Sequence, residues 1–140
     1  MLVTVLYRNE GEPATNRSIP FVDVDMGSWY ANAVIWAKQN GIVNGVNDTE
    51  FAPDTNITRE QIATIMFRYA QYKGYDVTQG GMLIREYSDY ENISDYALNA
   101  MTWSVNIGML SGRGNNNLAP QSYATRAEVA AILERFIKAN

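Results

Sequence analysis

The sequence repeats a short apolar stretch, which reads YANAVIWA at residues 30–37 and ALNAMTWS at residues 97–104. The tryptophan holds the same place in both copies. Other elements recur at the same offset: GIVNG at 41–45 with GMLSG at 108–112, FAP at 51–53 with LAP at 118–120, and ITR at 57–59 with ATR at 124–126. Repetition at a fixed period is typical of tandem modules that build surfaces between their copies. The pattern favours binding or scaffolding over catalysis.

Each copy also predicts a second, amphipathic helix. Apolar residues follow the helical spacing i, i+3, i+4, i+7 in both copies, as Ile62, Ile65, Met66 and Tyr69 and as Val129, Ile132, Leu133 and Phe136. Gly41 and Gly108 stand where a helix needs a left-handed C-cap. We therefore predict an all-α fold of tandem helix-loop-helix repeats, with short extended pieces at residues 19–24 and 82–87.

The first residues resemble the second helix of a repeat. LVTVLYR at 2–8 aligns with IATIMFR at 62–68 and with VAAILER at 129–135. We therefore interpret residues 1–12 as the tail helix of a truncated first repeat. Residues 21–73 form one full repeat, residues 74–86 a linker, and residues 87–140 a second full repeat.

The composition describes a globular chain and excludes several functions. Of the 140 residues, 46% are apolar and 19% are charged. There is no cysteine and no histidine, so the commonest zinc ligands and the commonest general base are absent. The formal net charge of −4 argues against a nucleic-acid partner, and no apolar run is long enough for membrane insertion. We predict a chain that is not an enzyme and has no metal site or cofactor.

Taken together, the repeated elements resemble the bacterial S-layer homology (SLH) domain. The resemblance rests on FVDV at 21–24, Trp29, the GxxxG elements, the FAP and LAP elements, and TRAE at 125–128, and it covers nearly the whole chain. It implies a pseudo-threefold helical spindle, truncated here, on the bacterial cell surface, in the cell wall or S-layer. It also implies that grooves between repeats bind secondary cell-wall polysaccharide, often through a pyruvate ketal. The first copy departs from the signature with Glu60-Gln61 in place of Ala-Glu.

Arg59 and Arg126 are the sharpest candidates for ligand binding. A guanidinium group presents a planar fork that matches a carboxylate, and a pyruvate ketal displays one. Both residues stand in the first turn of a predicted helix, where the helix dipole favours an anion. The alternative is an ion pair with an aspartate of the same fold, such as Asp23 or Asp89.

The neighbouring threonines are better explained by helix capping. Thr58 with Gln61, and Thr125 with Glu128, have the spacing of capping boxes, in which two side chains satisfy free N–H groups at a helix start. Such a cap also positions the adjacent arginine.

Aromatic, acidic and glycine residues complete the candidate site. Trp29 and Tyr96 start their helices and could stack on sugar rings, whereas Trp36 and Trp103 fit the core better. Asp23 and Asp89 could cap backbone N–H groups, pair with an arginine, or accept bonds from sugar hydroxyls. Gly45 and Gly112 provide tight turns that let the backbone approach a ligand. A second hypothesis is self-association through an edge of Leu2, Val5 and Leu6 in the truncated first repeat.

Overall fold

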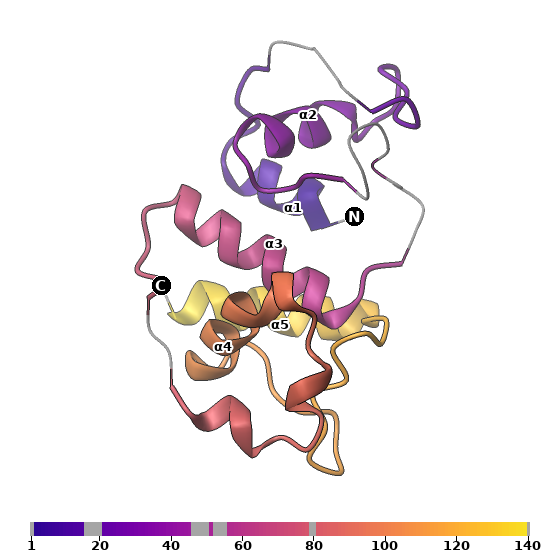
Figure 1. Cartoon of the computed structure of the whole chain (residues 1–140). Coiled ribbons are helices and arrows are strands. Elements are labelled where there is room, and N and C mark those ends of the chain that lie inside the picture. Colours follow the sequence, from indigo (N-terminus) through magenta and orange to yellow (C-terminus); the bar gives the residue numbers. More distant parts are fainter. Residues whose placement is uncertain (1, 16–20, 46–50, 52–55, 79–80, 140) are drawn as a thin grey trace. The chain divides into compact units, whose positions relative to one another are not determined.

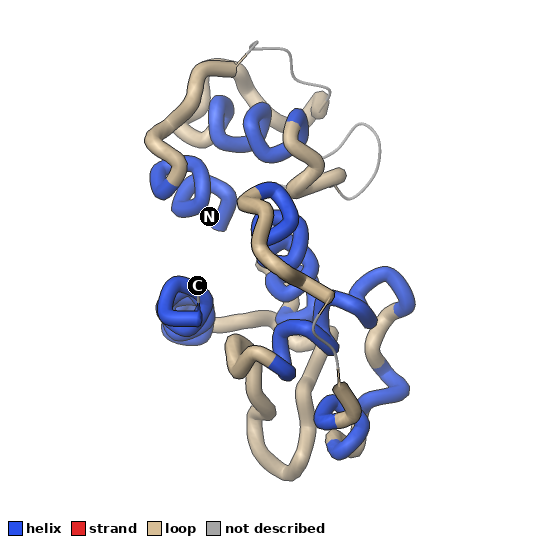
Figure 2. Tube along the Cα trace, turned by 90° about the vertical axis from the view of Figure 1, so that its left-hand side faces the viewer, coloured by secondary structure: helices blue, strands red, loops and turns tan. Residues whose placement is uncertain are grey.

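The structure is a computed structural model that describes residues 2–15, 21–45, 51, 56–78 and 81–139 (Figure 1). These residues divide into two compact units, 1–55 and 56–140. The described residues form helices and loops and contain no β-strand (Figure 2). The predicted all-α fold is confirmed. None of the described helices is both long and apolar enough to cross a membrane.

The first unit is built on two helices, α1 (Leu2–Asn9) and α2 (Ala31–Gln39), which pack together. Val34 and Ile35 are fully buried, and the ring of Tyr7 lies 5.6 Å from that of Trp36. Gly41 ends α2 with a φ of 71°, a left-handed conformation that glycine adopts without steric cost.

The apolar edge expected at the start of the chain is largely buried. Leu2 is 8% exposed and Leu6 is 2% exposed, whereas Val5 is 43% exposed. Of these three side chains only Val5 is therefore exposed, and self-association through this edge stays a prediction.

The second unit contains the remaining helices. These are α3 (Arg59–Tyr72), α4 (Leu98–Asn106) and α5 (Arg126–Ala139), with the short 3₁₀ helices η1 (Leu83–Glu86), η2 (Tyr90–Asn92) and η3 (Asp95–Ala97). Helix α3 packs against α4 through apolar side chains such as Ile62, Met66 and Met101, all with no exposed surface. The ring of Phe136 joins α5 to this core, because it lies 5.8 Å from Tyr69 and 6.3 Å from Trp103.

The prediction of an extended segment at residues 82–87 is wrong. Residues Leu83–Glu86 form η1, closed by hydrogen bonds from Arg85 N to Met82 O and from Tyr87 N to Ile84 O. The turn buries Ile84 and leaves Met82 and Leu83 exposed. Since no described segment offers this stretch a strand to pair with, the local hydrogen bonds of a 3₁₀ turn satisfy its backbone. The other expected piece, at 19–24, begins outside the described residues, and its described part, 21–24, is not a strand.

The start of α3 is joined to a loop of the second repeat. Arg59 N donates to Ser122 O at 3.0 Å, Glu60 N donates to Pro120 O at 2.9 Å, and Ala124 N donates to Ile57 O at 2.9 Å. The first N–H groups of a helix have no partner within it, and here the neighbouring loop supplies one. This junction positions the side chains described next.

Candidate functional site

Arg59 lies at the junction and is only 4% exposed. Its Nε donates to Leu118 O at 2.7 Å, Nη1 donates to Glu128 Oε2 at 2.5 Å, and Nη2 donates to Ser111 O. All three guanidinium nitrogens are therefore engaged within unit 2. The ion-pair partner is Glu128 rather than the aspartates considered from the sequence, although Asp89 also acts on Arg59 electrostatically.

Glu128 is shared between two arginines. Arg113 donates through Nε at 3.1 Å and also through Nη2, so Glu128 bridges Arg59 and Arg113. The hydrogen bonds from Arg113, ahead of the other contributions, hold the pKa of Glu128 at about 2. The same bonds raise the pKa of Arg113, whereas burial lowers that of Arg59. The carboxylate is thus ionised at neutral pH and fixed between two cations.

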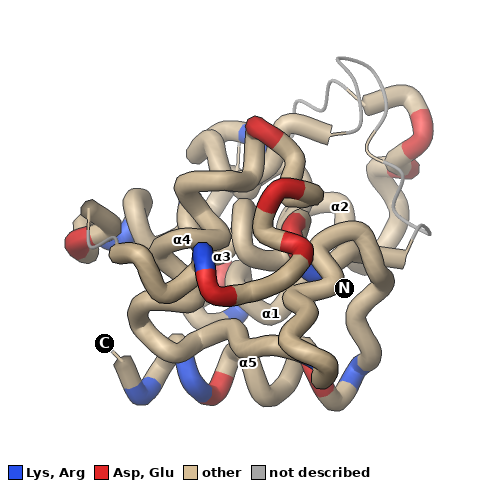
Figure 3. Tube along the Cα trace, turned by 60° about the horizontal axis from the view of Figure 1, so that its bottom comes forward, with Lys and Arg blue, Asp and Glu red and all other residues tan. Residues whose placement is uncertain are grey.

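These residues line a pocket of about 190 Å³, which also includes Gly112 and Arg135. The guanidinium of Arg135 is exposed and makes no hydrogen bond or ion pair with the residues that the structure describes. The lining carries three guanidinium groups and one carboxylate, a surplus of two positive charges. Figure 3 shows that acidic and basic residues share α5, so this surplus is local to the pocket.

The Gly112 turn has no room for a side chain. A Cβ atom there would lie 2.8 Å from Cε1 of Tyr87 and 3.0 Å from Asn117 O. Its counterpart Gly45 is required for a different reason, because its φ is 83°. Both positions are therefore restricted to glycine, Gly112 by the lack of space and Gly45 by its backbone conformation.

The two predicted aspartates bind backbone groups. Asp23 Oδ1 accepts from Phe51 N at 2.8 Å, and Asp89 accepts from Leu118 N and Ala119 N, each at 2.8 Å. Each aspartate therefore fastens the loop of its own repeat. This arrangement matches the capping alternative considered from the sequence.

Both capping boxes are formed. Thr58 and Gln61 exchange hydrogen bonds at the start of α3, and Thr125 and Glu128 do the same at the start of α5. Arg126 follows the second cap, is exposed, and does not line the pocket that contains Arg59. The two arginines of the repeat are thus placed differently: one is enclosed and one is open to solvent.

Tyr96 forms a second cluster in unit 2, around the buried carboxylate of Glu60. Glu60 is 3% exposed and accepts from Ser94 N at 3.0 Å, from Ser94 Oγ at 2.7 Å and from the Tyr96 hydroxyl at 3.4 Å. Tyr96 itself is 57% exposed. The Tyr96 hydroxyl is therefore bound to Glu60, while more than half of the residue's surface remains exposed to solvent.

We predict that Glu60→Gln lowers the pKa of the Tyr96 phenol. Burial raises this pKa most, and the charge of Glu60 together with its hydrogen bond raises it further. Ultraviolet titration of tyrosine ionisation, compared with a Tyr96→Phe variant that identifies the signal, measures the shift. An unchanged Tyr96 titration would mean that the carboxylate does not contact the phenol.

We also predict that Glu128 makes stability depend on pH in acid. Its folded pKa, about 2, lies below its ordinary value of 4.5, so its ionised form stabilises the fold. This stabilisation is fully present above pH 4.5 and is lost as the pH falls from 4.5 towards about 2. Denaturant unfolding of Glu128→Gln should show a flatter loss of stability over this interval than the parent chain shows. Parallel curves would contradict the assignment.

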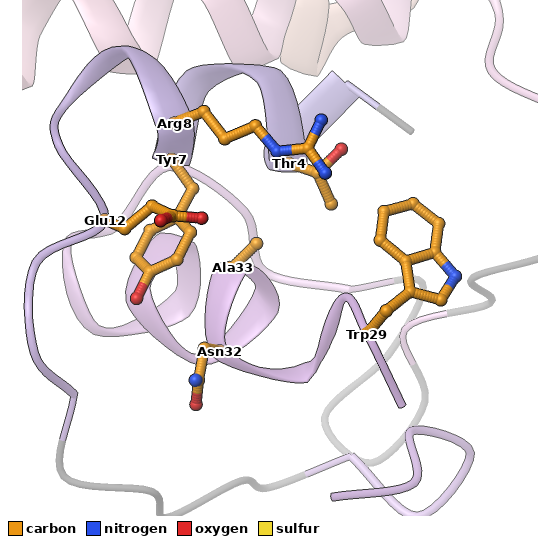
Figure 4. A pocket seen from close by; sticks show the side chains of 7 residues that line it. All are labelled: Thr4, Tyr7, Arg8, Glu12, Trp29, Asn32 and Ala33. Atoms are coloured by element: carbon orange, nitrogen blue, oxygen red, sulfur yellow. The ribbon is translucent and has the colours of Figure 1, made fainter. Parts of the chain in front are cut away.

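Unit 1 contains a separate pocket of about 300 Å³ (Figure 4). Its lining comes from α1, the segment after it, the residues just before α2 and the first turn of α2: Thr4, Tyr7, Arg8, Glu12, Trp29, Asn32 and Ala33. Trp29 is 69% exposed, whereas Trp36 and Trp103 are each 2% exposed. The tryptophans therefore divide as the sequence suggested, into one accessible ring and two core rings.

Sequence reasoning missed Arg113 and Arg135 as site residues. The repeats themselves could have identified Arg135, because Arg8, Arg68 and Arg135 occupy the same position in the three aligned helices. No such repetition identifies Arg113, since Val46 occupies the equivalent position in the other copy. Its role follows only from the fold, which brings the loop of 111–113 beside α5.

Tandem helical repeats that stack on one another define a class of modules whose surfaces bind partners. Residues 20–63 and 86–130 match the S-layer homology domain, and the chain belongs to this family. The resemblance noted from the sequence is confirmed. Such domains anchor proteins to the cell surface, and the chain is a cell-surface module of this kind.

Similar proteins include enzymes and surface proteins. The chain is 38% identical over 117 residues to an amylopullulanase of Thermoanaerobacterium thermosulfurigenes, covering 81% of this chain and 6% of that protein. It is 29% identical to the surface-layer 125 kDa protein of Lysinibacillus sphaericus, covering 95% of this chain and 11% of that protein. It is 27% identical to a cellulosome-anchoring protein of Acetivibrio thermocellus, covering 96% and 29%. The chain therefore spans a small part of each relative.

A solved structure supports the fold alone. The undecaheme cytochrome from the S-layer of Carboxydothermus ferrireducens aligns with a TM-score of 0.51 and 21% identity, over 96% of this chain and 20% of that one.

Proposed function

We propose that this chain anchors a longer surface protein by binding an anionic secondary cell-wall polysaccharide, through a carboxylate such as that of a pyruvate ketal. The observation that carries the proposal is the positive surplus in the pocket lined by Arg59, Arg113 and Arg135. Planar guanidinium groups bind carboxylates with two parallel hydrogen bonds. Local attraction of this kind explains how a chain with a net charge of −4 holds an acidic polymer.

The three arginines of the pocket have different roles in this proposal. Arg59 and Arg113 fix the loop and the position of Glu128, and their charge favours an anion. Arg135 is exposed and supplies the direct hydrogen bonds to the carboxylate of the ligand. Gly112 lets the turn pack closely against the ring of Tyr87 and the carbonyl of Asn117, which keeps the neighbouring loop in place beside the pocket. In this proposal Tyr96 and Trp29, both accessible, are stacking surfaces for further sugar rings.

The test is sedimentation of variants with purified cell walls. We expect Arg135→Ala to weaken binding by about tenfold, since a charge-assisted hydrogen bond contributes about 1.5 kcal/mol or more. Lys138→Ala is the matched control, because it removes an exposed cation of the same helix that does not line the pocket. Equal binding by the two variants would contradict the role of Arg135.

A second candidate function, assembly with another repeat, is favoured by the open start of α5. The backbone N–H groups of Arg59 and Glu60 bind the loop at 120–122, whereas their counterparts in Arg126 and Ala127 have no such partner among the described residues. An equivalent loop from another repeat would satisfy them. Sedimentation velocity over a wide concentration range tests this candidate. A strictly monomeric chain at all concentrations would argue against assembly between copies.

A further inference from the structure

We propose that Asn44 is a site of spontaneous modification, at which the side-chain amide becomes a carboxylate through a cyclic imide formed with Gly45. The reaction is intramolecular and needs no enzyme. Its support comes from the exposed pair Asn44-Gly45 and from the contrast with a second Asn-Gly pair, four residues earlier in the same repeat. The inference is independent of glycan binding.

The first observation is the glycine that follows the asparagine. The attacking atom of this reaction is the backbone nitrogen of the next residue, and a side chain on that residue crowds the attack. Glycine has none, so its nitrogen reaches the asparagine amide with the least steric obstruction. The sequence contains two such pairs, Asn40-Gly41 and Asn44-Gly45, and no other asparagine is followed by glycine.

The reaction balances with water as its only co-reactant. The backbone nitrogen of Gly45 loses its proton and bonds to Cγ of Asn44, while the bond from Cγ to Nδ2 breaks. The departing nitrogen takes up the proton and leaves as ammonia. Water then opens the cyclic imide at one of its two carbonyl groups. Opening at the side-chain carbonyl gives aspartate, and opening at the backbone carbonyl gives isoaspartate, in which the chain continues through the side-chain carbon.

The second observation is that the first pair is held at the end of α2. Asn40 is the C-cap of this helix, and its Nδ2 donates to Trp36 O at 2.8 Å. Gly41 N donates to Lys38 O at 3.2 Å. Both the leaving group and the attacking nitrogen are therefore engaged in hydrogen bonds that oppose cyclisation. Since Asn40 is itself exposed, exposure alone does not make an Asn-Gly pair reactive.

The third observation is that the second pair lies beyond these contacts. Ile42 N and Val43 N donate to Ala37 O at 2.8 and 3.3 Å, and the Ile42 and Val43 side chains are buried. Asn44 and Gly45 come next, and both are exposed. Within the described part of the chain, neither the Asn44 amide nor the Gly45 N–H makes a hydrogen bond. No contact among these residues therefore opposes attack of one group on the other.

The second repeat does not have this chemistry at the equivalent position. Ser111 and Gly112 stand in the places of Asn44 and Gly45, and serine has no amide to lose. Conversion of Asn44 therefore adds a negative charge to the turn of one repeat only, in a chain whose formal net charge is already −4. The same comparison supplies the test variant, Asn44→Ser, which introduces the residue type that the second repeat accommodates.

The test is peptide mapping by mass spectrometry after incubation of the whole folded chain in mildly alkaline buffer. Trypsin cleaves after Lys38 and after Arg59, so one peptide contains both Asn-Gly pairs, and its fragment ions assign the mass gain to either asparagine. We expect conversion at Asn44 to be at least about tenfold faster than at Asn40, with isoaspartate among the products. The rate should fall in mildly acidic buffer, because the attacking nitrogen must lose its proton.

Two controls separate the effect of the fold from that of the dipeptide. In denaturant the hydrogen bonds of Asn40 are lost, and the two pairs should react at similar rates. Asn44→Ser should abolish conversion at that position and leave the rate at Asn40 unchanged. Circular dichroism verifies that this variant is folded.

Three results would overturn the proposal. The first is an equal rate at Asn40 and Asn44 in the folded chain. The second is a product that contains aspartate without isoaspartate, because direct hydrolysis of the amide does not pass through the imide. The third is an Asn44 that stays intact in the folded chain while both pairs react in denaturant.

Discussion

Arg59→Ala is expected to lower the free energy of unfolding by about 3–5 kcal/mol, the range for breaking a buried ion pair. The guanidinium connects Leu118 O, Ser111 O and Glu128, and the alanine would leave these acceptors without their donor. Unsatisfied buried acceptors add to the loss. Chemical denaturation followed by circular dichroism measures the effect.

Arg126→Ala is the matched control, because the same residue type occupies the same repeat position but is exposed. Its expected effect is within about 0.5 kcal/mol, as for most surface substitutions. Similar losses in the two variants would show that Arg59 does not form the enclosed network described here. The contrast also separates a structural arginine from one that is free to meet a partner.

Phe136→Ala is expected to cost about 3–5 kcal/mol, as large-to-small changes of buried aromatic residues do. The ring is 5% exposed and lies 5.8 Å from Tyr69, 6.0 Å from Tyr75 and 6.3 Å from Trp103. Since Ile132 and Phe136 are the buried residues of α5, the substitution removes one of the two fully buried side chains of this helix. Thermal and denaturant unfolding of the variant measure the loss.

Ile137→Ala changes the next residue of α5, which is 65% exposed, and should be close to neutral. If Phe136→Ala were as mild as Ile137→Ala, α5 would not be docked through this ring. The lining of the pocket at Arg135 depends on the same docking, so Phe136→Ala should also weaken binding to cell walls.

Periodicity and capping predicted the helices well because their signals are local. The stripe of Ile62, Met66 and Tyr69 marks the buried face of α3, and Thr58 with Gln61 marks its start. Both sets lie within a few turns of one helix, so the sequence alone contains the interactions that form them. The strand expected at 82–87 failed because a strand needs a partner, which only the tertiary structure can supply.

The candidate site was predictable only in part. The importance of Arg59 and Gly112 could be inferred from the repeats, but the partner of Arg59 could not, because Glu128 lies far along the chain. Arg113 also reaches Glu128 only in the folded chain and has no arginine counterpart in the other repeat. A charge network between repeats is a long-range property, so local sequence patterns identify its members without their pairing.

The most direct test of the central claim is isothermal titration of the chain with pyruvylated cell-wall glycan and with the same glycan after removal of pyruvate. An arginine pocket that binds the ketal carboxylate predicts affinity for the stripped glycan at least about tenfold weaker, with the difference abolished by Arg135→Ala. Equal affinity for the two glycans would contradict recognition of the carboxylate.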